Sequence, residues 1–127
     1  MNPKAKKVKQ SLVAVILLAA FTGFTSCEKY SFLPPAVNPN ETWHFQGDIQ
    51  PIFSAKCISI SCHGGPQAPD LRPGKSYNAL TKGGYVNAPA ETSRLYVKMN
   101  SSEHLPRSTE ADRLKVLYWI QQGALNN

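Results

Sequence analysis

Cys57-Ile58-Ser59-Ile60-Ser61-Cys62-His63 is the stretch that decides how the rest of this chain is interpreted. It holds two of the three cysteines, with four residues between them, and it ends in an adjacent cysteine–histidine pair. The usual site for covalent attachment of haem c is Cys-x-x-Cys-His, and this stretch is an expanded form of that pattern. Two thiols must reach the two vinyl groups of one porphyrin while the histidine ligates the iron. The pattern predicts one covalent haem c held by Cys57 and Cys62, with His63 as the proximal iron ligand.

Two other chemistries are open to the same side chains. Cys57 and Cys62 could form a disulfide, as cysteines of exported proteins commonly do, and the protein would then be a haem-free exported binding module. Alternatively, Cys57, Cys62 and His63 could bind zinc together with another histidine. Adjacent cysteine and histidine side chains diverge, which is awkward for a tetrahedral site, and the sequence has no second Cys/His cluster to complete a zinc knuckle.

The N-terminus indicates export. Four lysines precede the apolar run Ser11–Phe21, which is shorter than the roughly 20 residues needed to span a bilayer. Small and polar residues follow up to Cys27, as in a secretory signal. The end of the segment resembles a bacterial lipobox, although Phe24 stands where leucine is usual. We expect residues 1–26 to be a lipoprotein signal peptide and Cys27 to carry the lipid. An ordinary signal peptide, with Cys27 as a leftover thiol, is the alternative.

The charge of the remaining chain excludes a nucleic-acid-binding function. The whole chain has 14 basic and 8 acidic residues, a formal charge of +6. Removing residues 1–26 takes away four lysines and no acidic residue, so ten basic residues remain against eight acidic ones and no basic run survives. A nucleic-acid-binding surface needs a concentrated positive patch.

Residues 27–40 are predicted to be the lipidated cysteine followed by a flexible tether. The segment Glu28–Asn40 contains three prolines and two asparagines and has no hydrophobic period, which is typical of a linker. The folded domain is then expected over residues 41–127. A domain of this size is near the lower limit for a self-sufficient core, and a buried haem would supply part of the missing apolar contact.

The spacing of capping residues, prolines and glycines predicts an all-α domain with long loops. A first helix is expected from about Ile49 to Cys57, with Asp48 as its N-cap and Pro51 in its first turn. Short helices are expected around residues 77–80 and over residues 93–99.

A last helix is expected to start after Ser108 or Thr109 and to stop at Gly123. Acidic residues in its first turn favour this start, because the helix dipole is positive there. The apolar face is expected to consist of Leu114, Leu117 and Tyr118, widened by Val116 and Ile120.

Several segments together resemble the small c-type cytochrome domains of exported bacterial lipoproteins. They are Asp48–Phe53, the stretch 57–63, Ala68–Leu71, Ser93–Tyr96 and Trp119–Ala124. The resemblance implies an all-α fold wrapped around one haem, with thioethers from Cys57 and Cys62. It also implies that Pro69 lies in the loop that orients His63, where a backbone carbonyl accepts the Nδ1 proton.

The resemblance does not determine the distal iron ligand. The family usually carries Met-Pro in the loop before the last helix, whereas this chain has Leu105-Pro106. Leucine has no donor atom, so the expected ligand is His104 or Met99, and an open distal position is the alternative. His44 is a third donor, expected at the surface. Thioether ligation raises the reduction potential relative to two imidazoles.

Two further groups of residues are expected near the haem. Arginine and tyrosine donate well to carboxylates, so the candidate partners of the haem propionates are Arg72, Arg94, Tyr77 and Tyr96. The helix contact behind the haem is expected to be built by Phe53, Tyr118 and Trp119.

These features predict a membrane-anchored monohaem c-type cytochrome that acts as a one-electron carrier and not as an enzyme. Its place would be the bacterial cell envelope, lipid-anchored to the inner or outer membrane, with the domain in the periplasm or at the cell surface. Its partners would be redox proteins of the respiratory chain or an envelope oxidoreductase. An open distal position would instead favour a haem sensor or a minor peroxidase.

Overall fold

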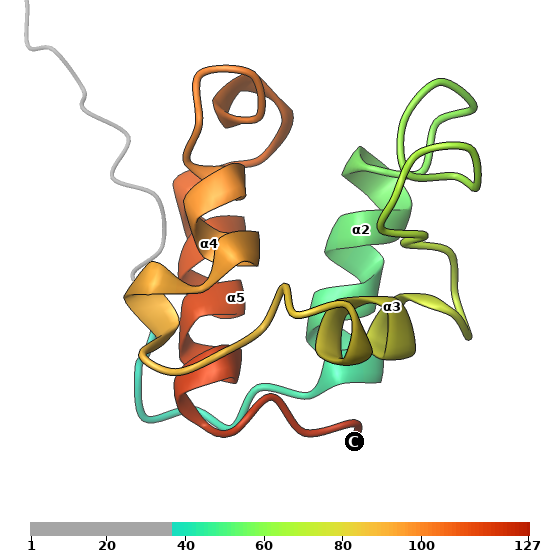
Figure 1. Ribbon diagram of the computed structural model, residues 1–127. Helices are drawn as coiled ribbons and strands as arrows, with labels where there is room; N and C mark the ends of the chain where they lie inside the picture. The colour runs from blue at the N-terminus through green and yellow to red at the C-terminus, as the bar shows by residue number, and fades with distance from the viewer. Residues whose placement is uncertain (1–36) are drawn as a thin grey trace, which may run out of the picture. The chain divides into compact units, whose positions relative to one another are not determined.

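The computed structural model describes residues 37–127, which form a set of short helices (Figure 1). The elements are, in chain order, η1 (Phe45–Ile49), α2 (Gln50–Lys56), α3 (Ser76–Lys82), η2 (Ala90–Thr92), α4 (Arg94–Met99), η3 (Leu105–Arg107) and α5 (Glu110–Gln121). No strand occurs among the described residues, in agreement with the all-α prediction. None of their helices is both long and apolar enough to cross a bilayer. The predicted signal peptide, Cys27 and residues 28–36 of the predicted tether lie outside the described part.

The packed part of the chain begins before residue 41. Val37 lies against the hydrophobic core. A turn follows, in which the Glu41 N–H donates to the Asn38 carbonyl at 3.3 Å. Of the residues that the sequence assigns to the tether, Val37 packs against the core, whereas residues 38–40 are exposed.

The predicted first α-helix is present as α2, with Ile49 as its N-cap and Pro51 in its first turn, and a wide π turn that was not predicted precedes it. In η1 the N–H groups of Ile49 and Gln50 donate to carbonyls five residues back, on His44 and Phe45. Proline lacks an N–H and displaces the carbonyl four residues before it, and a widened turn just ahead of Pro51 accommodates both effects. His44 is accordingly the N-cap of η1. Asp48, predicted as the N-cap, lies inside the π turn, where its carboxylate accepts from the His44 N–H at 2.9 Å.

The two middle helices lie close to their predicted positions. The C-cap of α3 is Gly83, and Gly84 then adopts a left-handed φ of +68°. α4 begins directly after Ser93. The buried Ser93 hydroxyl donates to the Tyr85 carbonyl at 2.8 Å and so ties the start of α4 to the segment that follows α3.

Thr109 caps α5 in a reciprocal pair with Asp112, which confirms the predicted start of this helix. The Thr109 hydroxyl accepts from the Asp112 N–H at 3.1 Å, and the Asp112 carboxylate accepts from the Thr109 N–H at 2.9 Å. The buried face differs from the predicted one: Val116 and Trp119 are fully buried, whereas Leu114 is only partly buried. The reason is that the Trp119 indole, the largest side chain of the helix, packs against η1.

One hydrophobic core joins elements from both ends of the described chain. The Phe45 ring centroid lies 5.1 Å from that of Tyr77 and 5.2 Å from that of Trp119. α4 also packs against α5. The fully buried apolar side chains of this core are Phe45, Ile49, Phe53, Leu80, Val116 and Trp119.

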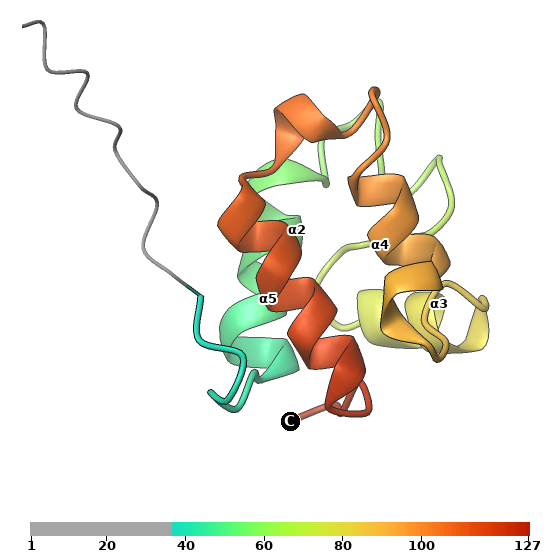
Figure 2. The ribbon, with the colours of Figure 1, turned by 90° about the vertical axis from the view of Figure 1, so that its left-hand side faces the viewer.

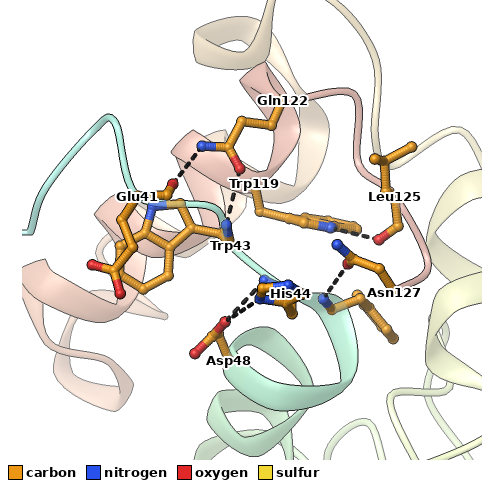
Figure 3. A network of polar contacts seen from close by, with 9 residues as sticks. Glu41, Trp43, His44, Asp48, Trp119, Gln122, Leu125 and Asn127 are labelled. Atoms are coloured by element: carbon orange, nitrogen blue, oxygen red, sulfur yellow. Dashed lines mark hydrogen bonds and ion pairs between the residues drawn. The ribbon is translucent and has the colours of Figure 1, made fainter.

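The chain end is fastened to the beginning of the first helix by polar contacts (Figure 3). The Gln122 side chain accepts from the Trp43 N–H at 3.0 Å and donates to the Glu41 carbonyl at 2.7 Å. The Asn127 side chain accepts from the Phe45 N–H at 3.0 Å. These contacts hold the N-terminal end of η1 against the C-terminal end of α5.

A buried glutamine connects α2 to the loop that follows it. Gln50 Nε2 donates to the Leu71 carbonyl at 3.1 Å, and Gln50 Oε1 accepts from the Ser76 hydroxyl. A buried amide is costly unless it is hydrogen-bonded, and here both of its ends have partners. Gln50 thereby holds the loop around Leu71 beside α2 and against the start of α3.

Candidate functional site

The predicted attachment stretch begins where α2 ends. Cys57 is the C-cap of α2, and its N–H donates to the Phe53 carbonyl at 2.8 Å. The chain then folds back, so that the His63 N–H donates to the Cys57 carbonyl at 3.0 Å. Gly64 permits this return, because a Cβ at its position would lie 2.6 Å from the Ile58 carbonyl oxygen. The two cysteines therefore belong to one tight loop.

The loop holds the His63 imidazole through its Nδ1 atom. His63 Nδ1 lies 3.0 Å from the Pro69 carbonyl oxygen. A carbonyl oxygen only accepts, so Nδ1 must carry the proton. In the neutral ring the lone pair is then on Nε2, which is the form that binds a metal. The contact that the sequence led us to expect for Pro69 is thus present, and Pro69 itself is buried.

A cavity lies beside this loop, bounded by residues of α2 and α4. It has two lobes, of about 260 Å³ and about 180 Å³. The residues that border both lobes are Cys57, His63, Gln67, Met99, Glu103 and His104. Cys62 borders the smaller lobe, and the apolar wall of the larger one is formed by Phe53, Pro69, Leu71 and Leu95.

Cys57 and Cys62 are both free thiols, and their surroundings differ. Burial, together with the nearby Cys62, raises the pKa of Cys57 to about 11. A side-chain hydrogen bond with Ser59 lowers the pKa of Cys62 below its ordinary value. These surroundings favour the thiolate form, which is the reactive one, at Cys62 and disfavour it at Cys57.

Both candidate distal ligands lie at this cavity. The segment after α4 and the loop after α2 are at the same end of the molecule (Figure 2). There the ring centroids of His63 and His104 are 6.4 Å apart, with the ring planes inclined by 29°. Met99 also borders both lobes, but it is buried in the core at the end of α4. His44 borders neither lobe; it is exposed at the start of η1, with its Nδ1 3.6 Å from Asp48.

Of the four residues considered as partners of haem propionates, Arg94 is the one that borders the cavity. Arg72 is engaged with Asp70, and the Tyr77 hydroxyl donates to a backbone carbonyl near the C-terminus. Tyr96 borders neither lobe.

Sequence reasoning missed a basic rim around the cavity. Three further exposed cationic side chains border it, those of Lys56, Lys98 and Arg107. Glu103 is the acidic residue among the lining. The sequence could have predicted one of these residues, Lys98. It is four positions after Arg94 and therefore lies on the same side of the helix.

Asp70 and Arg72 brace the loop that carries Pro69. The Arg72 guanidinium donates two hydrogen bonds to the Asp70 carboxylate, at 2.9 Å and 2.6 Å, and Lys75 lies 3.9 Å from it. The hydrogen bond from Arg72 is the main reason that the pKa of Asp70 is lowered to about 2. The same contact raises the pKa of Arg72.

Within residues 37–127 no group of three or more His, Cys, Asp or Glu side chains is arranged to hold a metal ion by itself. Comparisons with protein-family models, with curated proteins and with solved structures gave no match. The chemistry of the site then depends on the two thiols, the two imidazoles and the apolar wall around the cavity.

Proposed function

We propose that this chain is an exported, lipid-anchored monohaem c-type cytochrome that carries one electron at a time. One observation carries the proposal. Cys57, Cys62 and His63 border the same space, and the Pro69 carbonyl keeps the His63 imidazole in its metal-binding tautomer. A disulfide-bonded binding module has no comparable need for an oriented histidine beside the two thiols.

The side chains around the cavity fit a haem. Cys57 and Cys62 would supply the two sulfurs that thioether attachment needs, and His63 would supply a nitrogen ligand. Phe53, Leu71 and Leu95 form an apolar wall that would contact the group. Protein interiors are normally close-packed, so space of this size next to the core of a small domain favours a resident group.

A bound haem would supply the one-electron chemistry, because its iron changes between two oxidation states. The residues of the chain hold and tune that group. Cys57 and Cys62 would fix its position covalently, and His63 would bind through Nε2. The hydrogen bond from His63 Nδ1 to Pro69 raises the basicity of the ligating ring and prevents it from rotating. The apolar wall limits the access of water to one side of the site.

The basic rim supports a redox partner with an acidic docking face. Lys56, Lys98 and Arg107 are exposed around the cavity, and complementary charge accelerates and orients association. We assign Arg94 to a haem propionate, since it reaches the larger lobe. The partners that we propose are redox proteins of the respiratory chain or an envelope oxidoreductase.

The location that we propose is the bacterial cell envelope. It rests on the signal-like residues 1–26 and on Cys27 as the lipid-bearing residue. The anchor would hold the domain in the periplasm or at the cell surface, where an attached haem can meet its partners.

The proposal is tested on the purified protein after denaturation. We expect the haem to stay with the polypeptide through acid-acetone extraction and gel electrophoresis, and the mass to exceed that of the processed chain by one haem. A non-covalent haem protein treated in parallel should lose its haem stain. A mass that corresponds to a simple disulfide, with no haem stain, would show that the haem-free binding module is the correct description.

A further inference from the structure

We infer that His104 is the distal iron ligand of the proposed haem site and that Ser101 is the residue that positions it. This inference rests on the proposed function, because it concerns the second axial position of the same iron. It deepens that function by choosing between the two donors that the sequence left open.

The hydrogen bonds of Ser101 determine the tautomer of His104. The Ser101 hydroxyl lies 2.8 Å from the Lys98 carbonyl oxygen and 3.0 Å from His104 Nδ1. A hydroxyl has one proton, and a carbonyl oxygen only accepts. The proton therefore goes to Lys98, and the Ser101 oxygen must accept from His104 Nδ1–H. The lone pair of the neutral His104 ring is then on Nε2, as it is in His63.

The backbone holds this arrangement in place. The N–H groups of His104 and Leu105 both donate to the Ser101 carbonyl, at 3.0 Å and 2.9 Å. The turn brings His104 back over Ser101 at the edge of the cavity. In each of the two imidazoles, Nδ1 is thus hydrogen-bonded to an oxygen of the same loop. Nε2 of each ring is therefore available to a metal.

The distance between the two rings agrees with one shared metal. Bonds from imidazole nitrogen to a first-row metal are about 2.0–2.1 Å, as zinc sites show, so two imidazoles can share one ion only if their nitrogens come within about 4 Å of each other. The distance from each nitrogen to the centre of its ring adds to that value. The two rings are stacked with their centroids 6.4 Å apart, so the two imidazoles are close enough for both to reach one ion when their Nε2 atoms turn toward it.

Met99 is less well suited to the role. Its side chain is 7 % exposed and belongs to the hydrophobic core. Methionine at the end of a packed helix is commonly a gap-filling core residue. No hydrogen bond within the described residues orients its sulfur, whereas His104 is oriented through Ser101.

The experiment compares His104→Ala, Met99→Leu and Ser101→Ala in the purified haem-loaded protein. His44→Ala is the matched control, because it removes a histidine that borders neither lobe. Covalent haem content is measured first for every variant, as the pyridine haemochrome. The axial ligand is then read from the ferric absorption spectrum and from the rate of carbon monoxide binding to the ferrous protein.

We expect the wild-type ferric spectrum to be low-spin and to lack the far-red charge-transfer band of an iron–thioether bond. His104→Ala should become high-spin and return to low-spin when free imidazole is added, whereas Met99→Leu and His44→Ala should stay low-spin. Ser101→Ala should bind carbon monoxide about 10-fold faster, because loss of an orienting partner typically weakens a metal ligand by that order. Ser101→Thr, which keeps the hydroxyl, should restore the slow rate.

A thioether band in the wild type, or a high-spin Met99→Leu next to a low-spin His104→Ala, would overturn the inference in favour of Met99. Equal carbon monoxide rates in Ser101→Ala and Ser101→Thr would overturn the positioning role of Ser101. Wild-type protein without covalent haem would overturn the proposed function itself, and the haemochrome measurement separates that result from a wrong choice of ligand.

Discussion

The Phe45 ring and the Trp119 indole pack with their centroids 5.2 Å apart and their planes tilted by 40°. Phe45 belongs to η1 and Trp119 to α5, so the pair joins the first and the last helix of the described chain. Trp119 Nε1 also donates to the Leu125 carbonyl at 2.9 Å, which satisfies the one polar atom of the indole (Figure 3). This contact lies in the hydrophobic core of the domain.

Trp119→Ala should therefore destabilise the domain by about 3–5 kcal/mol, because it removes a fully buried aromatic side chain and leaves a cavity. Urea unfolding of the purified protein, followed by circular dichroism, measures the change. The control is Val97→Ala on the exposed side of α4, which should change the stability by less than about 0.5 kcal/mol. A cost for Trp119→Ala as small as that of the control would mean that this contact does not support the core.

Replacing both thiols, as Cys57→Ala with Cys62→Ala, should yield a poorly folded chain. Without the proposed haem the cavity would lack an apolar filling, and a domain of this size has little other core to compensate. The matched control is Ile60→Ala, a change of an exposed side chain in the same loop that keeps both thiols. We expect the control to retain haem and helical circular dichroism. Full helicity of the cysteine variant without haem would show that haem is not needed for folding.

Cys27→Ser should release the protein from the membrane without loss of haem. Acyl chains bind a bilayer with about 0.8 kcal/mol per buried methylene, and this contribution disappears with the thiol. Fractionation of cells into membrane and soluble parts, followed by haem staining, measures the change. If the variant stayed in the membrane fraction, the anchor would have to be an uncleaved signal segment or the tether.

Asp70→Asn should lower the thermal unfolding midpoint in a pH-dependent way. The folded-state pKa of Asp70 is lowered to about 2, so its contribution is fully present above its ordinary pKa of about 3.9 and is lost as the pH falls through about 2. The difference in midpoint between the wild type and Asp70→Asn should be constant from neutral pH down to about pH 5 and should shrink below about pH 4. In an Arg72→Ala background the same substitution should have little effect. A difference that did not change between neutral pH and pH 2 would contradict the role of the ionised carboxylate.

The sequence predicted a helix end correctly where a capping residue close by in the chain determines it. Thr109 and Asp112 are close in sequence, so their reciprocal cap depends on no distant part of the fold. The α-helix expected from about Ile49 is confirmed as α2, with Pro51 in its first turn and Cys57 as its C-cap. The prediction of Asp48 as its N-cap was wrong, because the π turn η1 precedes α2 and Asp48 lies inside that turn.

The sequence by itself determined the all-α class, and it led us to predict the attachment stretch and the candidate donors for the distal position. These predictions use residue types that are close together in the sequence, so they can be made without knowledge of the tertiary structure. Only the tertiary structure decided that His104 lies 6.4 Å from His63 and that His44 is remote from the cavity. These placements depend on how α4 packs against α5 and on how the loop after α2 folds back to Pro69. Such contacts join residues far apart in the chain, and no local pattern encodes their distances.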